Sequence, residues 1–149
     1  MFIEYFDSPI GKIAIRANDE NLIEVSLENY GEENKNHITS LCKIQLDEYF
    51  FKKRKSFSLP LQFSGTPFQK KVWEELKNIP FGLTVTYKEL SEKIGNKNAC
   101  RAVANAVGKN PFLIILPCHR VIASGNKLGG FSVGTDKKII LLEHEDIKL

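Results

Sequence analysis

The chain has 149 residues, of which 42% are hydrophobic and 26% are charged, and its formal net charge is +3. This is the composition of an ordinary soluble globular protein with one domain or two small ones. No apolar run reaches the length of a membrane span and the first residues do not resemble a signal peptide, so we expect neither membrane insertion nor secretion.

Charge and cysteine usage narrow the choice of partners and compartment. Residues 1–64 contain 8 Lys and Arg against 10 Asp and Glu, whereas residues 65–149 contain 13 against 8. A basic second part suits an anionic partner such as nucleic acid, although modest positive charge is also common without one. The three cysteines, Cys42, Cys100 and Cys118, show no paired or metal-ligand spacing. This predicts free thiols, a cytoplasmic location and no metal site.

The first part of the chain is typical of a small antiparallel sheet with one helix. Short strand-like segments at 2–6, 12–17 and 22–27 are separated by residues that favour turns. This pattern predicts a three-stranded meander. Apolar residues at helical spacing within 38–51 predict an amphipathic helix lying on that sheet.

Two further segments close this part. The basic run Lys52-Lys53-Arg54-Lys55 is read as a solvated helix end that complements the helix dipole, with a phosphate contact as the alternative. Residues 58–67 contain Pro60, Gly65 and Pro67 and predict a linker, with a domain boundary at Ser64.

The second part begins with a helix and continues into a helix-turn-helix. Thr66 fits an N-cap before Pro67, and the helix that follows should end before Pro80. Thr86 should cap a helix over 87–94, with Glu89 completing the capping box. After a turn at 95–98, a second helix is expected over 99–107, with Asn98 as a possible cap.

The helix over 99–107 has two distinct faces. Cys100, Val103 and Val107 recur at helical spacing and should face the core. The opposite face carries small and polar residues, namely Arg101, Ala102, Asn105, Ala106 and Lys109. This pattern suits a helix that approaches DNA, but a plain helical hairpin with a solvated face fits it equally well.

A thiol, an imidazole and a guanidinium follow one another at Cys118-His119-Arg120. The apolar run 112–116 predicts a buried strand or extended core segment that ends at Pro117, so the trio should emerge from the core into a turn. Cys118 is either an inert buried cysteine or a nucleophile activated by His119. Glu145 is a candidate for the third group that would orient the imidazole.

The sequence Pro-Cys-His-Arg-Val at 117–121 resembles the active-site signature of the O6-alkylguanine-DNA alkyltransferases. The resemblance covers the whole second part in the family's order and spacing. The segments that carry it are Thr66–Gln69, Val85–Tyr87, Arg101–Val103, Gly108–Pro111, Gly129–Ser132 and Leu141–Glu145, with weaker support from Ser8–Gly11.

The resemblance implies a chemistry for the trio and its neighbours. Cys118 would attack the alkyl carbon on O6 of a damaged guanine, and His119 would take the thiol proton through a water. Glu145 would stabilise the imidazolium, and Tyr87 would protonate the leaving base at N3. Asn110 matches the family's hinge asparagine. The thioether product has no route back, so each molecule would act once, without a cofactor.

The resemblance also implies double-stranded DNA as partner, bound through the minor groove. Nothing in the sequence indicates an obligate dimer, so we expect a monomer. Because the target atom is inaccessible in a duplex, the nucleotide must be flipped out, and Arg101 would fill the vacated space. The other residues expected to contact DNA are Thr86, Ala102, Asn105, Lys109 and Arg120. Those expected to line the substrate pocket are Leu113, Val121, Phe131, Ser132 and Val133.

The implied fold is α+β. Residues 1–64 would form a structural, ribonuclease-H-like domain, and residues 65–149 a mostly helical, winged-helix-like domain that binds DNA and transfers the alkyl group. Three other functions remain as alternatives: a module that recognises alkylated bases without repairing them, a cysteine hydrolase that uses Cys118 and His119, and a transcription regulator built on the helix-turn-helix.

Overall fold

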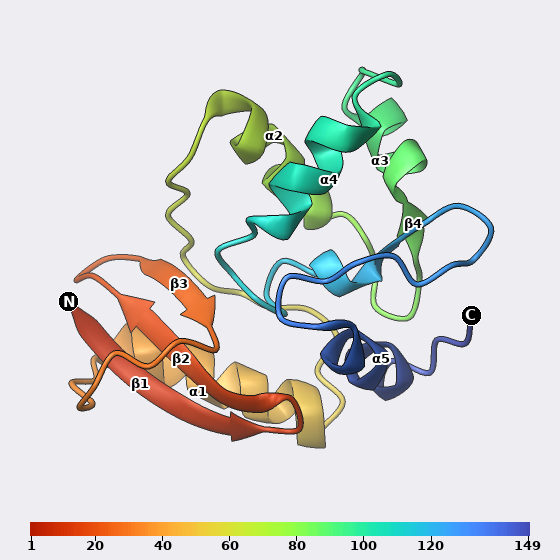
Figure 1. Cartoon of the computed structure of the whole chain (residues 1–149). Helices are drawn as coiled ribbons and strands as arrows, with labels where there is room; N and C mark the ends of the chain where they lie inside the picture. Colours follow the sequence, from red (N-terminus) through yellow and green to blue (C-terminus); the bar gives the residue numbers. More distant parts are fainter. The chain divides into compact units, whose positions relative to one another are not determined.

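A computed structural model describes all 149 residues and divides them into two units (Figure 1). Unit 1 comprises Met1–Phe63 and Pro111–Ile115, and unit 2 comprises Ser64–Asn110 and Leu116–Leu149. Five residues from the second half of the sequence therefore belong to the first unit. None of the helices has the length and apolar character that a membrane-spanning helix requires.

Unit 1 is built on an antiparallel sheet with strand order β1-β2-β3. The strands are β1 (Phe2–Ser8), β2 (Gly11–Ala17) and β3 (Leu22–Ser26), so the predicted meander is confirmed. β1 and β2 pair along their whole length and are joined by two residues. β2 places Ile13 and Ile15 in the core, because alternate side chains of a strand point to the same face.

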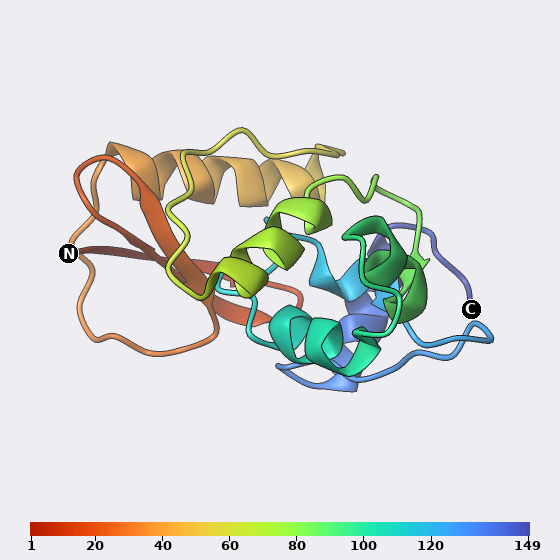
Figure 2. The same ribbon diagram turned by 90° about the horizontal axis from the view of Figure 1, so that it is seen from above.

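The predicted helix is α1 (His37–Phe51), and it lies along one face of the sheet (Figures 1 and 2). Its start is fixed by a capping box: the Asn36 side chain accepts from the Thr39 N–H, and the Thr39 side chain accepts from the Asn36 N–H. Leu46 and Tyr49 are fully buried on the side that faces the sheet. The α+β class expected from the sequence is thus confirmed.

Segment 60–62 pairs with β3 rather than forming a free linker. The Leu22 N–H donates to the Pro60 carbonyl at 2.7 Å, and the Gln62 N–H donates to the Leu22 carbonyl at 3.0 Å. The prediction of a linker is therefore wrong for these three residues. Backbone groups at a sheet edge need partners, and this segment supplies them to β3.

The apolar run 112–116 is buried but is not a strand. It makes a single parallel bridge, between Phe112 and Val25 of β3, and Ile114 then adopts a φ of 71°. A β-branched residue rarely takes a positive φ, so Ile114 is a strained position that ends the extended conformation. The two hydrogen bonds of the bridge join Val25 to Pro111 and Leu113, each at 2.9 Å.

Unit 2 begins with two helices whose starts match the sequence signals. α2 (Pro67–Leu76) has Thr66 as its N-cap in a capping box with Gln69. α3 (Tyr87–Lys93) follows β4 (Val85–Thr86), and Thr86 forms the predicted capping box with Glu89.

The second helix of the helix-turn-helix is α4 (Cys100–Gly108), and it differs from expectation in three details. Its N-cap is Ala99 with no side-chain hydrogen bond, so the assignment of Asn98 as cap is wrong. Cys100 is only half-buried. Ala106 is buried, with 2% of its surface exposed, so it does not belong to the solvent face.

α2 and α4 are joined by a buried hydrogen bond. The indole N–H of Trp73 donates to the Ala106 carbonyl at 2.9 Å. Trp73 is 2% exposed, so its large apolar surface also contributes to this contact. This packing explains why Ala106 faces inward and sets the orientation of α4 against α2.

The remaining elements of unit 2 surround the Cys-His-Arg trio. They are η1 (Cys118–Arg120), β5 (Val121–Ile122) and α5 (Thr135–His144). β5 pairs in parallel with β4, which places the start of α3 beside the end of η1. α5 was not expected from the sequence, although part of it lies in a segment that carries the resemblance.

Replacement of Trp73 by Phe should lower the free energy of unfolding by about 1–3 kcal/mol, because the buried Ala106 carbonyl would lose its donor. Urea denaturation measures this loss. Lys71→Ala, at an exposed position of the same helix, is the matched control and should change stability little. Equal stability of Trp73→Phe and the wild type would contradict the importance of this bond.

Candidate active site

The turn predicted after Pro117 is the short 3-10 helix η1. It is closed by hydrogen bonds from the Cys118 N–H to the Leu116 carbonyl at 2.7 Å and from the Arg120 N–H to the Pro117 carbonyl at 3.0 Å. The side chains do not emerge from the core as expected, because Cys118, His119 and Arg120 are 3%, 0% and 4% exposed. A ligand can reach them only through a cavity.

Glu145, one residue after α5, is the acceptor that holds this turn. Its carboxylate lies 2.6 Å from the Nε2 atom of His119 and accepts two hydrogen bonds from the Arg120 guanidinium, at 2.8 and 3.0 Å. It also accepts from the Gly82 N–H at 3.0 Å. The structure therefore brings His119 and Glu145 together, as predicted for the orienting group, while their catalytic roles stay predictions.

Arg120 is part of this buried network and does not contact solvent. Besides its bonds to Glu145, it donates to the Ile79 carbonyl at 2.6 Å. Its guanidinium also lies 5.7 Å from the centre of the Phe81 ring. Three N–H groups of the guanidinium are thus bonded inside the protein, so the structure does not place Arg120 with the exposed residues expected to contact DNA.

The contact with Glu145 fixes the tautomer of His119. An ionised carboxylate can only accept a hydrogen bond, so Nε2 carries the proton and, in the neutral ring, Nδ1 has the free lone pair. Nδ1 is buried and makes no hydrogen bond to the protein. It is therefore the atom of His119 that can accept a proton.

The environment keeps this pair in the protonation states that a base requires. Burial lowers the pKa of His119 and outweighs the opposing effect of Glu145, so the imidazole is neutral. For Glu145, burial raises the pKa, but the hydrogen bonds from His119 and Arg120 outweigh it and lower the pKa well below its usual range. Glu145 is consequently a carboxylate at neutral pH.

Cys118 is a neutral thiol in this structure. Burial raises the pKa of Cys118 to about 11, while a hydrogen bond from the Asn110 side chain and the charge of Lys138 act in the opposite direction. The Asn110 amide also donates to the Leu116 carbonyl at 2.8 Å. Asn110 thus links the end of α4 to the segment before Cys118, while its role as a hinge stays a prediction.

A cavity of about 320 Å³ opens onto Cys118. Small-molecule sites are of this size and are lined mainly by apolar groups with a few polar ones. It is lined by Tyr87, Ala104, Asn105, Val107, Gly108, Cys118, Gly130, Phe131 and Ser132.

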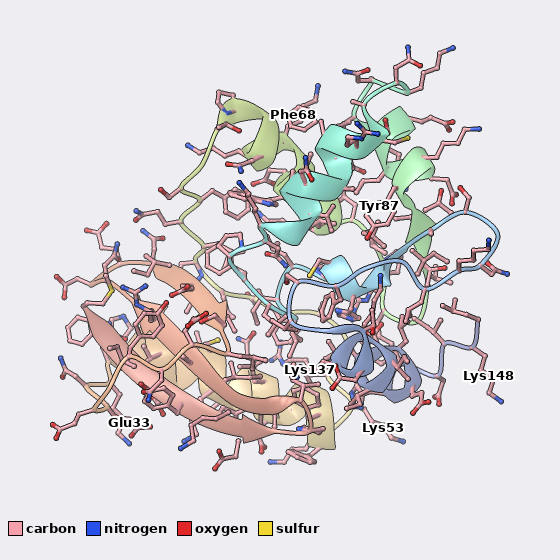
Figure 3. The ribbon with its side chains drawn as sticks, in the orientation of Figure 1. Glu33, Lys53, Phe68, Tyr87, Lys137 and Lys148 are labelled. Atoms are coloured by element: carbon pink, nitrogen blue, oxygen red, sulfur yellow. The ribbon has the colours of Figure 1, made fainter.

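Tyr87, labelled in Figure 3 at the start of α3, contributes a hydroxyl to this cavity. Burial raises its pKa, so it is a neutral phenol that can donate a proton. Gly129 lies against the ring with a φ of 72°, and a Cβ there would approach the Tyr87 ring to 3.3 Å. Gly129 therefore leaves room for the ring while allowing the left-handed turn.

Of the five residues expected to line the substrate pocket, Phe131 and Ser132 do so. Val121 and Val133 are not part of the lining. Leu113 is also not part of it and belongs to unit 1, where its N–H is bonded to Val25. Its assignment to the pocket came with the resemblance, and the structure does not place it in the lining.

The residues expected to bind DNA lie mostly on one exposed face of α4. Arg101, Ala102, Asn105 and the following Lys109 are all exposed, and Asn105 also borders the cavity. Thr86 stands at the start of α3, where its hydroxyl accepts from the Glu89 N–H. Their contacts with DNA stay predictions.

Sequence reasoning missed Lys138 of α5. It is fully buried, and its ammonium donates to the carbonyls of Val121 at 2.7 Å and Gly130 at 3.0 Å. Its spacing of three residues before Leu141 would have been a signal only if the helix α5 had been predicted. No group of three or more His, Cys, Asp or Glu side chains is placed to hold a metal ion.

The free energy of unfolding should fall as the pH is lowered from about 7 to about 2. His119 and Glu145 have lowered pKa values in the folded chain, so each binds fewer protons than when unfolded. Their stabilising contributions are present above unfolded pKa values of about 6.5 and 4.3 and are lost as the pH falls through the folded values. Urea denaturation across this range measures the effect.

Glu145→Gln should lower stability at neutral pH by about 3–5 kcal/mol, since it leaves the buried Arg120 without its counter-ion. It should also remove the part of the pH dependence below about pH 4.3, which belongs to the Glu145 carboxylate. Glu143→Gln, at an exposed position near the end of α5, is the control and should do neither. An unchanged pH dependence in Glu145→Gln would show that the pair does not titrate as described.

Comparison with known proteins agrees with this arrangement of residues. Residues 67–147 match the family "6-O-methylguanine DNA methyltransferase, DNA binding domain", and residues 1–63 match its "ribonuclease-like domain". A relative from Methanosarcina barkeri named methylated-DNA–protein-cysteine methyltransferase is 41% identical, with 100% of this chain and 99% of the relative covered. A relative of the same name from Methanosarcina acetivorans is 40% identical over 97% of this chain and 98% of its own.

Solved structures that resemble this chain belong to the same family. The crystal structure of Mycobacterium tuberculosis OGT in complex with DNA superposes with a TM-score of 0.88 at 37% identity, covering 98% of this chain and 93% of that one. The similarity extends over both units rather than over the helix-turn-helix alone. The chain belongs to the 6-O-methylguanine DNA methyltransferase family.

Proposed function

We propose that this chain repairs alkylated DNA by transferring the alkyl group of O6-alkylguanine, and of O4-alkylthymine, to the sulfur of its own Cys118. The observation that supports this most is the position of Cys118 in the wall of a base-sized cavity, next in sequence to the His119–Glu145 pair. A nucleophile, a base and a group that orients the base are the parts that such a transfer needs.

The transfer is an in-line displacement at the alkyl carbon. The Cys118 sulfur forms the new bond to carbon as the bond from carbon to O6 breaks. The thiol proton passes through one water to Nδ1 of His119, and Glu145 stabilises the imidazolium that results. Tyr87 donates its phenolic proton to N3 of the leaving guanine, which would otherwise depart as an anion in an apolar cavity.

The raised pKa of Cys118 keeps the thiol unreactive until a base occupies the cavity. At neutral pH the group is a buried thiol, which reacts slowly with electrophiles in solution. Removal of its proton is useful only when a base fills the cavity beside it. Asn110 assists, because its side chain hydrogen-bonds the sulfur and stabilises the ionised form.

Access to the cavity requires a flipped nucleotide, which costs a few kcal/mol of unstacking and unpairing. α4 is proposed to enter the minor groove, where Ala102 allows close approach and Arg101 fills the space left in the stack. Asn105, Lys109 and Thr86 would contact the strand on either side. Such contacts carry little sequence information, which suits a protein that must find lesions anywhere.

Each molecule is proposed to act once, because a thioether cannot return to a thiolate without another reaction. The protein would act as a monomer in the cytoplasm, where its three free cysteines stay reduced. No cofactor takes part in the proposed steps.

Incubation with a duplex carrying one O6-methylguanine should add one methyl group to the peptide that contains Cys118, saturating at one per protein. Intact and peptide masses measure this. Cys118→Ser should gain none, and Cys100→Ser, at the half-buried cysteine of α4, should react like the wild type. Stable binding to the damaged duplex without methyl gain would instead indicate a recognition module, and repeated turnover on an ester or peptide would indicate a hydrolase.

Arg101→Ala should slow methyl transfer from duplex DNA by about tenfold or more, because about 1.4 kcal/mol of support for the flipped state corresponds to tenfold. Its reaction with free O6-benzylguanine, which needs no flipping, should be unchanged. Lys93→Ala, an exposed cation on α3, is the control. Equal slowing with both substrates would place Arg101 in the chemistry rather than in flipping.

A further inference from the structure

Lys138 is a buried cation that the proposed chemistry does not use. Its side chain is fully buried near the start of α5, and its ammonium makes only two hydrogen bonds, to the carbonyls of Val121 and Gly130. An ammonium has three protons to donate, so one is left over. It forms no salt bridge with any carboxylate, in contrast to the neighbouring Lys137, which lies 3.8 Å from Asp136.

Burial of a charge without a counter-ion is costly, and a protein retains one mainly where it serves a function. The other buried cation of this unit, Arg120, is neutralised by the only buried carboxylate nearby, Glu145. Two carbonyl dipoles offset the charge of Lys138 only in part. The site thus contains one positive charge more than its carboxylates can balance.

The partners of Lys138 place its charge beside the nucleophile. Val121 ends the 3-10 turn that begins at Cys118, and Gly130 lines the cavity together with Cys118. The two groups interact electrostatically. The charge of Lys138 lowers the pKa of Cys118, and Cys118 raises the pKa of Lys138. Burial is the larger effect on Lys138 and lowers its pKa to about 8, which leaves the ammonium mostly protonated at neutral pH.

We propose that Lys138 is the counter-ion of the Cys118 thiolate. Its ammonium has no counter-ion while Cys118 is a neutral thiol, and it stabilises the negative charge once the thiol is deprotonated. The proposal rests on the function proposed above and adds a residue to it. Lys138 acts on the reaction through the Cys118 sulfur, whose negative charge it stabilises, so it is a positioning residue rather than a catalytic one. Its two carbonyl partners hold it between the Cys118 turn and the cavity wall, where it cannot move away to solvent.

The same charge also acts on the base. It lowers the pKa of His119, which keeps the imidazole neutral until a proton is offered. When the proton moves from Cys118 to His119, the thiolate gains the ammonium as partner and the imidazolium gains Glu145. Arg120 and Glu145 already satisfy each other, so Cys118 and His119 are the titratable groups that respond to Lys138.

The test measures the reactivity of the Cys118 thiol with iodoacetamide between about pH 7 and about pH 9. Because the thiolate is the reacting form, its rate follows the thiolate fraction. Lys138→Gln keeps a hydrogen-bond donor but removes the charge. Its rate should be about tenfold lower or more at each pH, corresponding to a rise of about one unit in the Cys118 pKa. Peptide masses assign the rate to Cys118 rather than Cys100.

Two further variants separate charge from packing. Lys138→Arg keeps the charge and should react within about threefold of the wild type, even if its melting temperature falls as far as that of Lys138→Gln. Lys137→Gln, labelled as Lys137 in Figure 3, removes a charge from the next residue of α5 and should react like the wild type.

The proposal would be overturned if the iodoacetamide rates of the variants followed their melting temperatures rather than the charge at position 138. It would also be overturned if Lys137→Gln lowered the rate as much as Lys138→Gln. If Lys138→Gln does not fold, Lys138→Arg decides: a tenfold loss in that charged variant would overturn it as well. Iodoacetamide contains no DNA, so a failure here is distinct from a failure of methyl transfer. Methyl transfer by the wild type does not require that Lys138 has this role. Conversely, Lys138 can stabilise the Cys118 thiolate in a protein that transfers no methyl group.

Discussion

One buried carboxylate, that of Glu145, determines how the site is built. It accepts hydrogen bonds from the His119 ring, from the Arg120 guanidinium and from the Gly82 backbone. A carboxylate has room for about four such bonds, so a single side chain joins the 79–82 loop, the Cys118 turn and the end of α5. Arg120 extends the network to Ile79. Orientation of the base and integrity of the fold therefore depend on the same group.

Local chemistry is what the sequence predicts well. The N-cap at Thr66 and the capping box at Thr86 were readable because each depends on residues that are close in the sequence. The three strands were readable because alternation and turn residues agreed. The contact of His119 with Glu145 spans 26 positions and no local rule predicts it. The sequence offered Glu145 only as a candidate, and the resemblance gave it the role of the third group.

Features that depend on the packing of distant segments were missed or misjudged. Segment 60–62 looked like a linker, since the edge of β3 that receives it cannot be seen in sequence. Leu113 was placed in the pocket, because the strained φ of Ile114 that turns the chain has no signal in an apolar run. The burial of Arg120 was not predicted, because its partner Glu145 lies 25 positions away in the sequence. The burial of a charged side chain can be predicted from a sequence only when the residue that pairs with it is known.

The assignment of Pro111–Ile115 to unit 1 has a consequence for synthesis of the protein. The N-terminal 63 residues leave the ribosome well before this segment, yet the edge of β3 is completed only when it arrives. Until then Val25 exposes an unpaired backbone, which is a hazard for association with other chains. The edge of the first unit is therefore completed only after most of the second has been translated, including the whole helix-turn-helix. The two units are consequently not independent modules, and a gene cut at residue 64 would divide one of them.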